Sequence, residues 1–317
     1  MCVNLTRSIH ARILCTGCTR YAAVHACRVM LEVRPVSRPF GPTIPRLMLG
    51  KALREMRERK GMSREEAGEN FGWSEGKIRT IENGQVGVDK VDLAALLALY
   101  GESDDSGELD ELRKQSRQRG FWVKYGPVQK TYATYLDLES AAKKVSSFDL
   151  AVVNGLMQTP EYARAAIEVP APGIGPDEVE RLVQLRAVRQ QRLTADDPLG
   201  LWAILDEAAL CRVIGGPEVM RVQLEKLLEL ADLPNIDLQV VPFAAGAHPG
   251  TWGSFTLLEF PESLRPPAVY IETRGGEIYL EDNAEVKRCN LSYVRLCATA
   301  LSPAESKKLI RSIAREL

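Results

Sequence analysis

Apolar and polar positions follow a helical period over residues 49–100. Leu49, Leu53 and Met56 recur at that spacing, which predicts an amphipathic helix with one buried stripe. Gly61 then supplies the left-handed residue that ends such a helix. The opposite side of the helix carries mainly cations, namely Lys51, Arg54, Arg57, Arg59 and Lys60, interrupted by Glu55 and Glu58.

Two more short helices are predicted across a tight turn. Ser63 and Glu66 have the spacing of a capping box, so a helix begins at Arg64 and runs to about residue 70. Its buried residue is Ala67, whose small side chain lets another helix cross closely. Phe71-Gly72-Trp73 makes the turn, and Ser74 is the expected N-cap of the next helix. This order of elements is a helix-turn-helix.

The helix that begins after Ser74 is the predicted DNA-reading element. Ile78 and Ile81 face the core, and the N-terminal half of such a helix enters the major groove. The candidate base contacts are Lys77 or Arg79 with guanine, Glu75 with cytosine and Thr80 with a thymine methyl, and any of them is compatible with the sequence. Phosphate contacts are expected from the amides at the helix N-termini and from the side chain of Arg64. The DNA-binding residues that we predict are Arg64, Ser74, Glu75, Lys77, Arg79, Thr80 and Asn83.

The segments Leu53-Arg54-Glu55-Met56-Arg57, Gly61-Met62-Ser63 and Ile78-Arg79-Thr80-Ile81-Glu82-Asn83-Gly84 resemble the phage-repressor class of helix-turn-helix domains, the XRE (xenobiotic response element) family. The resemblance implies a compact all-helical DNA-binding domain over residues 42–101. Two glycines depart from the family pattern: Gly68 follows Ala67 where a leucine is common, and Gly76 stands where a side chain normally reads a base. Each glycine costs helix stability of about 1 kcal/mol relative to alanine, and Gly76 predicts weak or shape-based base readout at that point.

An acidic linker and helix over residues 102–119 lead into a second region, residues 120–317. Here we expect a helix ending near Ser147 and a helix from Asp177 to Leu193 with four arginines on its solvent side, namely Arg181, Arg186, Arg189 and Arg192. Strands are predicted at 199–205, 236–241, 253–260, 268–272 and 277–280, separated by Gly/Pro turns. The predicted fold is therefore an all-α helix-turn-helix domain of phage-repressor type, followed by an α+β effector domain with a small antiparallel sheet.

The second region also carries a resemblance. The strings Gly155-Leu156-Met157-Gln158-Thr159, Tyr162-Ala163-Arg164, Arg189-Gln190-Gln191-Arg192-Leu193, Asp206-Glu207-Ala208-Ala209-Leu210 and Gln239-Val240-Val241-Pro242-Phe243 are similar to the C-terminal domain of actinobacterial XRE regulators. That antitoxin-like family is associated with morphological differentiation and antibiotic production. Its members are often encoded beside a small partner protein, so the resemblance implies a protein partner, and it supplies no catalytic residues.

Composition adds limits to this picture. With 317 residues, of which 45% are hydrophobic and 26% charged, the chain can bury more than one core. The net charge of −1 requires that any DNA-binding face be a localised basic surface. No window reaches the length of a transmembrane span, and the first residues lack the apolar core and cleavage site of a signal peptide, so we expect a cytoplasmic protein.

Residues 1–41 need a separate interpretation, because four cysteines and two histidines lie before a Pro/Arg-rich run. Cys15 and Cys18 have the spacing of a zinc or redox pair, but the segment holds no second paired motif. A disordered arm explains it more simply, as does a translated upstream region whose true start is Met30, Val36 or Met48. An ordered basic arm would follow a DNA backbone. No metal and no cofactor are predicted for the chain.

An enzyme hypothesis rests on scattered acidic residues and one histidine in the effector domain: Asp206, Glu207, Glu272, Glu281, Asp282 and His248. The sequence lacks a His-x-x-x-His pair, a Gly-x-Ser-x-Gly elbow and a phosphate-binding loop, so we predict a protein that is not an enzyme. Two binding roles remain open. A ligand sensor needs an enclosed pocket, with Trp202, Trp252 and Tyr270 as candidate walls. An antitoxin-like module needs an exposed apolar patch or sheet edge for a partner. Either way we expect a homodimer, because one helix-turn-helix reads few base pairs.

Overall fold

The computed structural model describes residues 43–169, 173–261, 265–273 and 276–317. The prediction of a disordered or mis-started arm over residues 1–41, with its Cys15–Cys18 pair, lies outside this part of the chain.

Five helices form the N-terminal domain: α1 (Thr43–Arg59), α2 (Arg64–Glu69), α3 (Glu75–Glu82), α4 (Lys90–Tyr100) and α5 (Glu108–Gln115). The first begins six residues before the predicted start at Leu49. Their shared core contains Leu49, Leu53, Ala67, Ile78, Ile81 and five residues from Val88 to Tyr100, with Leu109 of α5 added. Leu49 and Leu53, which defined the helical period, are thus buried, and Met56 packs against this core partly buried.

Local sequence signals account for the ends of these helices. Gly61 adopts a φ of 74° after α1. The Ser63 hydroxyl accepts from the Glu66 amide at 3.1 Å, and the Glu66 carboxylate accepts from the Ser63 amide at 2.7 Å, which confirms the predicted capping box. Ser74 caps α3 by accepting from the amide of Lys77 at 3.2 Å. The turn between α2 and α3 is therefore specified by residues within it.

The C-terminal region contains a six-stranded sheet with the order β3-β2-β1-β4-β5-β6. The strands are β1 (Lys144–Asp149), β2 (Gly200–Asp206), β3 (Ile236–Val241), β4 (Phe255–Glu259), β5 (Ala268–Thr273) and β6 (Gly276–Leu280). Its helices are α6 (Lys130–Ala141), α7 (Pro160–Glu168), α8 (Pro176–Gln190), α9 (Glu207–Cys211), α10 (Pro217–Leu230), α11 (Asn283–Thr299) and α12 (Pro303–Glu316), with short 3-10 turns η1 (Phe121–Tyr125), η2 (Gly155–Met157), η3 (Gln191–Thr194), η4 (Phe243–Ala245) and η5 (Pro249–Trp252). An α+β effector region is confirmed.

The sheet is larger than predicted, and it is mixed. Strands β1, β2 and β3 pair in parallel, whereas β1, β4, β5 and β6 pair antiparallel. Parallel neighbours require a long crossover, and here the helices α7 to α10 provide it. The sequence reading missed β1 because it extended the α6 helix to Ser147. This strand is covered on both faces, with Val145 to Phe148 all buried, so it lacks the alternation that reveals a half-exposed strand.

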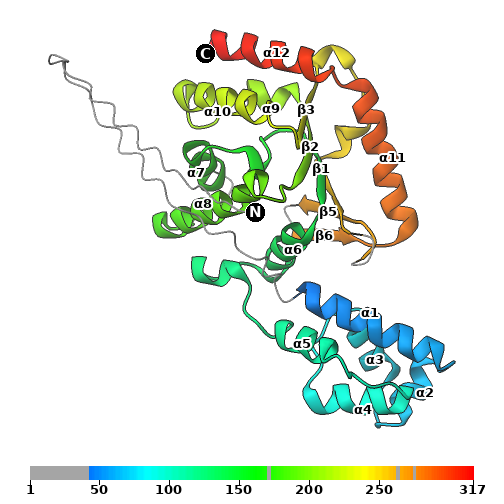
Figure 1. Cartoon of the computed structure of the whole chain (residues 1–317). Coiled ribbons are helices and arrows are strands. Elements are labelled where there is room, and N and C mark those ends of the chain that lie inside the picture. Colours follow the sequence, from blue (N-terminus) through cyan, green and yellow to red (C-terminus); the bar gives the residue numbers. More distant parts are fainter. Residues whose placement is uncertain (1–42, 170–172, 262–264, 274–275) are drawn as a thin grey trace, which may run out of the picture. The chain divides into compact units, whose positions relative to one another are not determined.

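Helices cover the two faces of the sheet unequally (Figure 1). Residues of α6, α7, α9, α10 and α12 form the larger core with Val145, Leu201 and their neighbours on one face. On the other face, α11 packs with Tyr293 and Leu296 against a core that includes Phe148 and Ile204. Successive residues of β1 and β2 therefore serve different cores, as the pleat of a strand requires.

The four arginines of the α8 region do not form the solvent-facing stripe that the sequence pattern predicts. Arg189 is only 7% exposed and pairs with Glu139 of α6, while Arg192 donates to the backbone oxygens of Glu139 and Ala142. Because α8 packs against other elements on more than one side, a charge on its polar face ends inside the domain.

Candidate DNA-binding interface

Helix α3 places its predicted base-reading residues on the surface of the helical domain. Ile78 and Ile81 are 1% and 3% exposed and attach the helix to the core. Arg79 and Asn83 are exposed, and within the described residues the Arg79 guanidinium has no ion-pair or hydrogen-bond partner. Arg79 is thus available to an external acceptor such as a base edge or a phosphate.

Lys77 has partners inside the domain. Its ammonium lies 3.3 Å from the centroid of the Trp73 ring and 3.3 Å from a carboxylate oxygen of Asp92 on α4. Both contacts hold the Lys77 side chain against the domain, so a DNA contact by Lys77 has to replace or share the Asp92 interaction.

Thr80 and Glu75 occupy different surroundings on the same helix. The Thr80 hydroxyl donates to the backbone oxygen of Lys77 at 2.9 Å, which leaves its methyl group and its oxygen lone pairs for DNA. Glu75 is exposed in the first turn and borders an open hollow. Ser74 is exposed as well, but its hydroxyl is used by the cap.

A buried ion pair, which the sequence pattern did not predict, joins α1 to the end of α3. Arg57 was placed on the solvent side of the first helix, yet its side chain is 7% exposed and that of Glu82 is 1% exposed. The Arg57 Nε donates to Glu82 Oε1 at 2.5 Å, and its Nη2 donates to Oε2 at 3.2 Å. A usable signal existed, since Arg57 follows Leu49 and Leu53 at intervals of four residues and so belongs to the buried stripe.

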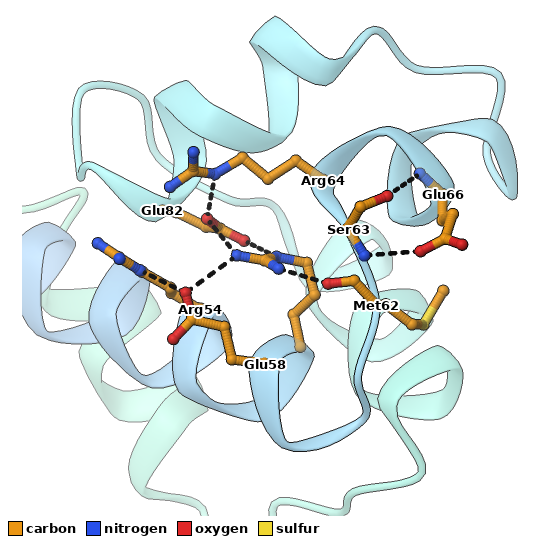
Figure 2. A network of polar contacts seen from close by, with 8 residues as sticks. Arg54, Glu58, Met62, Ser63, Arg64, Glu66 and Glu82 are labelled. Atoms are coloured by element: carbon orange, nitrogen blue, oxygen red, sulfur yellow. Dashed lines mark hydrogen bonds and ion pairs between the residues drawn. The ribbon is translucent and has the colours of Figure 1, made fainter.

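Arg64 contributes to the same network, as Figure 2 shows. Its Nε donates to Glu82 Oε2 at 2.7 Å, while the side chain remains 28% exposed. Arg57 also donates to the backbone oxygen of Met62 at 2.5 Å. The network therefore ties α1, the α1–α2 turn, the first residue of α2 and the last residue of α3 together. Within the part of the chain that the structure describes, the two terminal nitrogens of Arg64 make no hydrogen bond or ion pair, so they remain available to a phosphate.

The surface beside this network is hollowed by an open depression of about 390 Å³. Arginines and acidic residues from α1 and from the starts of α2 and α3 line it: Arg54, Arg57, Glu58, Ser63, Arg64, Glu65 and Glu75. Arg54 is held there by Glu58 at 2.8 Å. The amides at the start of α2 and the guanidiniums of Arg54 and Arg64 are suited to a phosphate of the DNA backbone, while Glu58, Glu65 and Glu75 oppose it.

Glycines explain how closely the helices of this domain approach one another. A Cβ on Gly50 would lie 2.5 Å from the backbone oxygen of Glu82, and one on Gly68 would lie 2.6 Å from that of Trp73. Gly68 thus permits the close contact between α2 and the following turn. A Cβ on Gly76 meets nothing nearer than the Ser74 hydroxyl at 3.7 Å, so packing does not require glycine at this position.

In the effector domain, the structure joins two of the residues considered for catalysis. His248 Nε2 lies 3.2 Å from Asp206 Oδ2, and His248 Nδ1 accepts from the amide of Gly250 at 3.2 Å. Both ring nitrogens are thereby occupied, and the pair fixes the loop that follows β3. Glu207 accepts from the amide of Phe243 at 2.6 Å. Glu281 pairs with Arg265, and Asp282 caps α11. In the part of the chain that the structure describes, no three His, Cys, Asp or Glu side chains gather as metal ligands do.

The three aromatic residues proposed as pocket walls do not share a site. The Trp202 indole donates to Gln239 at 2.9 Å and packs edge-on to Tyr293, on the α11 face of the sheet. Tyr270 packs on the opposite face. Trp252 is 99% exposed on η5. The sheet itself separates Trp202 from Tyr270.

Comparison with known families agrees with this architecture. A profile described as a helix-turn-helix domain matches residues 48–116. A second profile, described as a domain of unknown function (DUF5753), matches residues 132–312, which is more than half of the chain. The chain belongs to the DUF5753 family. Searches of curated proteins and of solved structures found no match.

The helix-turn-helix match and the exposed face of α3 together make this DUF5753 protein a DNA-binding regulator. Among the described helices, none has the length and apolar composition needed to cross a membrane.

Proposed function

We propose that this protein is a sequence-specific transcriptional regulator of XRE type that binds operator DNA as a homodimer in the cytoplasm. The exposed Arg79 on a helix capped by Ser74 carries the proposal, because it presents a free guanidinium on the face of α3 that enters the major groove. Two copies of α3 in successive grooves would supply the sequence length that a single helix lacks. The actinobacterial resemblance of the effector domain supports the same role.

We further propose that the effector domain binds and does not catalyse. Support comes from the His248–Asp206 pair, in which both imidazole nitrogens already serve the loop, so neither is free to carry a proton to a substrate. In this proposal the domain responds to a small ligand or a small partner protein and thereby alters the spacing of the two DNA-reading helices.

Selection of genomic fragments by the purified protein at near-physiological salt tests the DNA-binding proposal. At low salt, attraction to the DNA phosphates dominates the affinity. The selection therefore measures base readout only at near-physiological salt. The variant Lys77→Ala/Arg79→Ala removes two cations from α3. The matched control, Arg221→Ala/Lys226→Ala, removes an exposed and a half-buried cation from α10. We expect a recurring pair of half-sites with wild type and control, and none with the α3 variant, whose circular dichroism should stay native.

A second role is favoured by one observation, the exposure of two aromatic side chains on the loop after β3. Trp252 is 99% exposed and Phe243 is 59% exposed, although the loop is fixed by His248 and by the buried Gly250 against Phe148. Exposed aromatic groups on a fixed loop are suited to a protein partner. Absence of any enriched DNA sequence with wild-type protein would favour this antitoxin-like role, in which the partner is sequestered or is needed for DNA binding.

A further inference from the structure

Arg186 on α8 is partly buried in the C-terminal domain, and its Nη1 donates to the side-chain oxygen of Gln158. Within the described ranges, no aspartate or glutamate oxygen lies within 4.0 Å of its guanidinium. Arginine stays charged in proteins, and a charge that is partly withdrawn from water without a counter-charge is costly.

Gln158 cannot supply that counter-charge. It is 4% exposed, its amide nitrogen donates to the backbone oxygen of Val153 at 2.7 Å, and its own backbone oxygen accepts from Gln190 at 2.8 Å. These bonds fix the Gln158 amide so that its oxygen faces Arg186. The contact orients the guanidinium but leaves its charge uncompensated.

The neighbouring Arg189, in contrast, has a carboxylate that compensates its charge. Arg189 donates from Nε and Nη2 to the two oxygens of Glu139, both at 2.7 Å, and from Nη1 to the Tyr132 hydroxyl at 2.9 Å. Glu139 also accepts from Tyr135 at 2.6 Å. Its carboxylate is thus fully used by Arg189 and Tyr135, which leaves Arg186 as the excess positive charge.

The electrostatic surroundings agree with the contacts. Burial lowers the pKa of Arg186, Arg189 lowers it further, and Tyr132 and Glu272 act in the opposite direction. Glu272 lies on β5 and is exposed, so it acts over a longer distance than an ion pair. It shares its sheet face with Tyr270, and Tyr270 pairs with Tyr279 of β6.

We propose that Arg186 anchors a binding site for a small anionic ligand whose carboxylate or phosphate group completes the missing ion pair. The planar guanidinium has five N–H donors, and its unused donors match two oxygens of such a group. The Tyr132 hydroxyl, which accepts from Arg189 at 2.9 Å, also interacts electrostatically with Arg186. This site specifies the chemical class of ligand for the ligand-sensing role proposed above. Its test does not involve DNA, so a failure of the anion site can be distinguished from a failure of the DNA-binding proposal.

The direct test is a titration of full-length protein labelled with ¹⁵N-arginine, followed through the Nε–Hε signals. The signal of Arg186 is assigned as the one lost in Arg186→Lys. We expect inorganic phosphate or succinate to move this signal saturably at constant ionic strength, with sodium chloride leaving it in place. An Arg186 signal that neither anion moves would overturn the site.

Thermal unfolding provides a second test, with Arg181→Gln as the matched control on the same helix. Arg181 donates to the backbone oxygen of Tyr125 at 3.4 Å. Its replacement by glutamine removes the same positive charge from α8 as the replacement of Arg186 does. Phosphate or succinate should raise the midpoint of wild type and of Arg181→Gln, but not that of Arg186→Gln. Without anions, Arg186→Gln should unfold at the wild-type midpoint or above it, because an uncompensated charge is gone.

Glu272→Gln separates the anion site from a simple structural role for Arg186. If Arg186 binds anions, this variant removes a repelling charge and tightens phosphate binding several-fold, with the anion-free midpoint unchanged. If Glu272 is instead the counter-charge of Arg186 in solution, the anion-free midpoint falls in both Glu272→Gln and Arg186→Gln, and the proposal is wrong.

Discussion

Arg57 and Glu82 form an ion pair inside the helical domain, with Nε and Oε1 2.5 Å apart and both side chains almost fully buried. The hydrogen bond that Glu82 accepts from Arg57 raises the pKa of Arg57. The pair connects the first helix to the last residue of α3, and thus fixes the DNA-reading helix relative to the rest of its domain.

Glu82→Ala should lower the free energy of unfolding by about 3–5 kcal/mol, because it leaves a buried guanidinium without its partner. Glu102→Ala is the control: it also removes one carboxylate from an arginine of α1, but its partner Arg59 is exposed at the surface, so stability should hardly change. Urea denaturation measures both. Equal losses in the two variants would contradict a special role for the buried pair.

Two glycines of the helix-turn-helix should respond oppositely to alanine. Gly76→Ala should stabilise the domain by about 1 kcal/mol, because the position is open and helical. Gly68→Ala should destabilise it by about 1–3 kcal/mol, since the added carbon would lie 2.6 Å from the Trp73 backbone oxygen and the backbone must shift. Thermal unfolding of the two variants beside wild type decides this, and a stabilised Gly68→Ala protein would show that the contact is looser than described.

Asp92→Asn should increase affinity for DNA several-fold at fixed salt. The substitution releases Lys77 from an ion pair of 3.3 Å and removes a negative charge near α3. Asp105→Asn, an exposed change outside any helix, controls for the altered net charge. Fluorescence anisotropy with the selected operator measures both variants; unchanged or weaker binding by Asp92→Asn would mean that the ion pair positions Lys77 for DNA.

Asp149 should make the effector domain less stable as the pH rises. Burial raises the pKa of Asp149 to about 7, against the opposing hydrogen bonds from Ser147 and Asn154. The folded state therefore holds a proton that the unfolded state has already released between about pH 4 and pH 7. The stabilisation is complete below the unfolded pKa and is lost as the pH rises through the folded pKa.

Asp149→Asn removes this titration. Between pH 5 and pH 8, wild type should lose up to about 3 kcal/mol more of its unfolding free energy than the variant does, at about 1.4 kcal/mol per pKa unit. The comparison of slopes in urea denaturation is the measurement, because the amide also changes the absolute stability. Parallel pH profiles would show that Asp149 is ionised in the folded protein at pH 5.

The sequence by itself determined the helix-turn-helix and most of its surface. Gly61, the Ser63–Glu66 capping box and Ser74 act through contacts within a few residues, so their geometry is readable from spacing. The same holds for the strands from Ile236 onward, which the sequence marks as short runs between Gly/Pro turns. The exposure of Arg79 follows from the helical period once Ile78 is placed in the core.

Tertiary structure decided what depends on residues far apart in the chain. Strand β1 was hidden because both its faces are covered, and its parallel pairing with β2 depends on the intervening helices. The ion pair of Arg57 with Glu82 spans 25 residues and that of Arg189 with Glu139 spans 50. Helical periodicity predicts which side of a helix is polar, but only packing decides whether that side meets water or a carboxylate from a distant segment, because the free energy of a charge depends on the groups that fold around it.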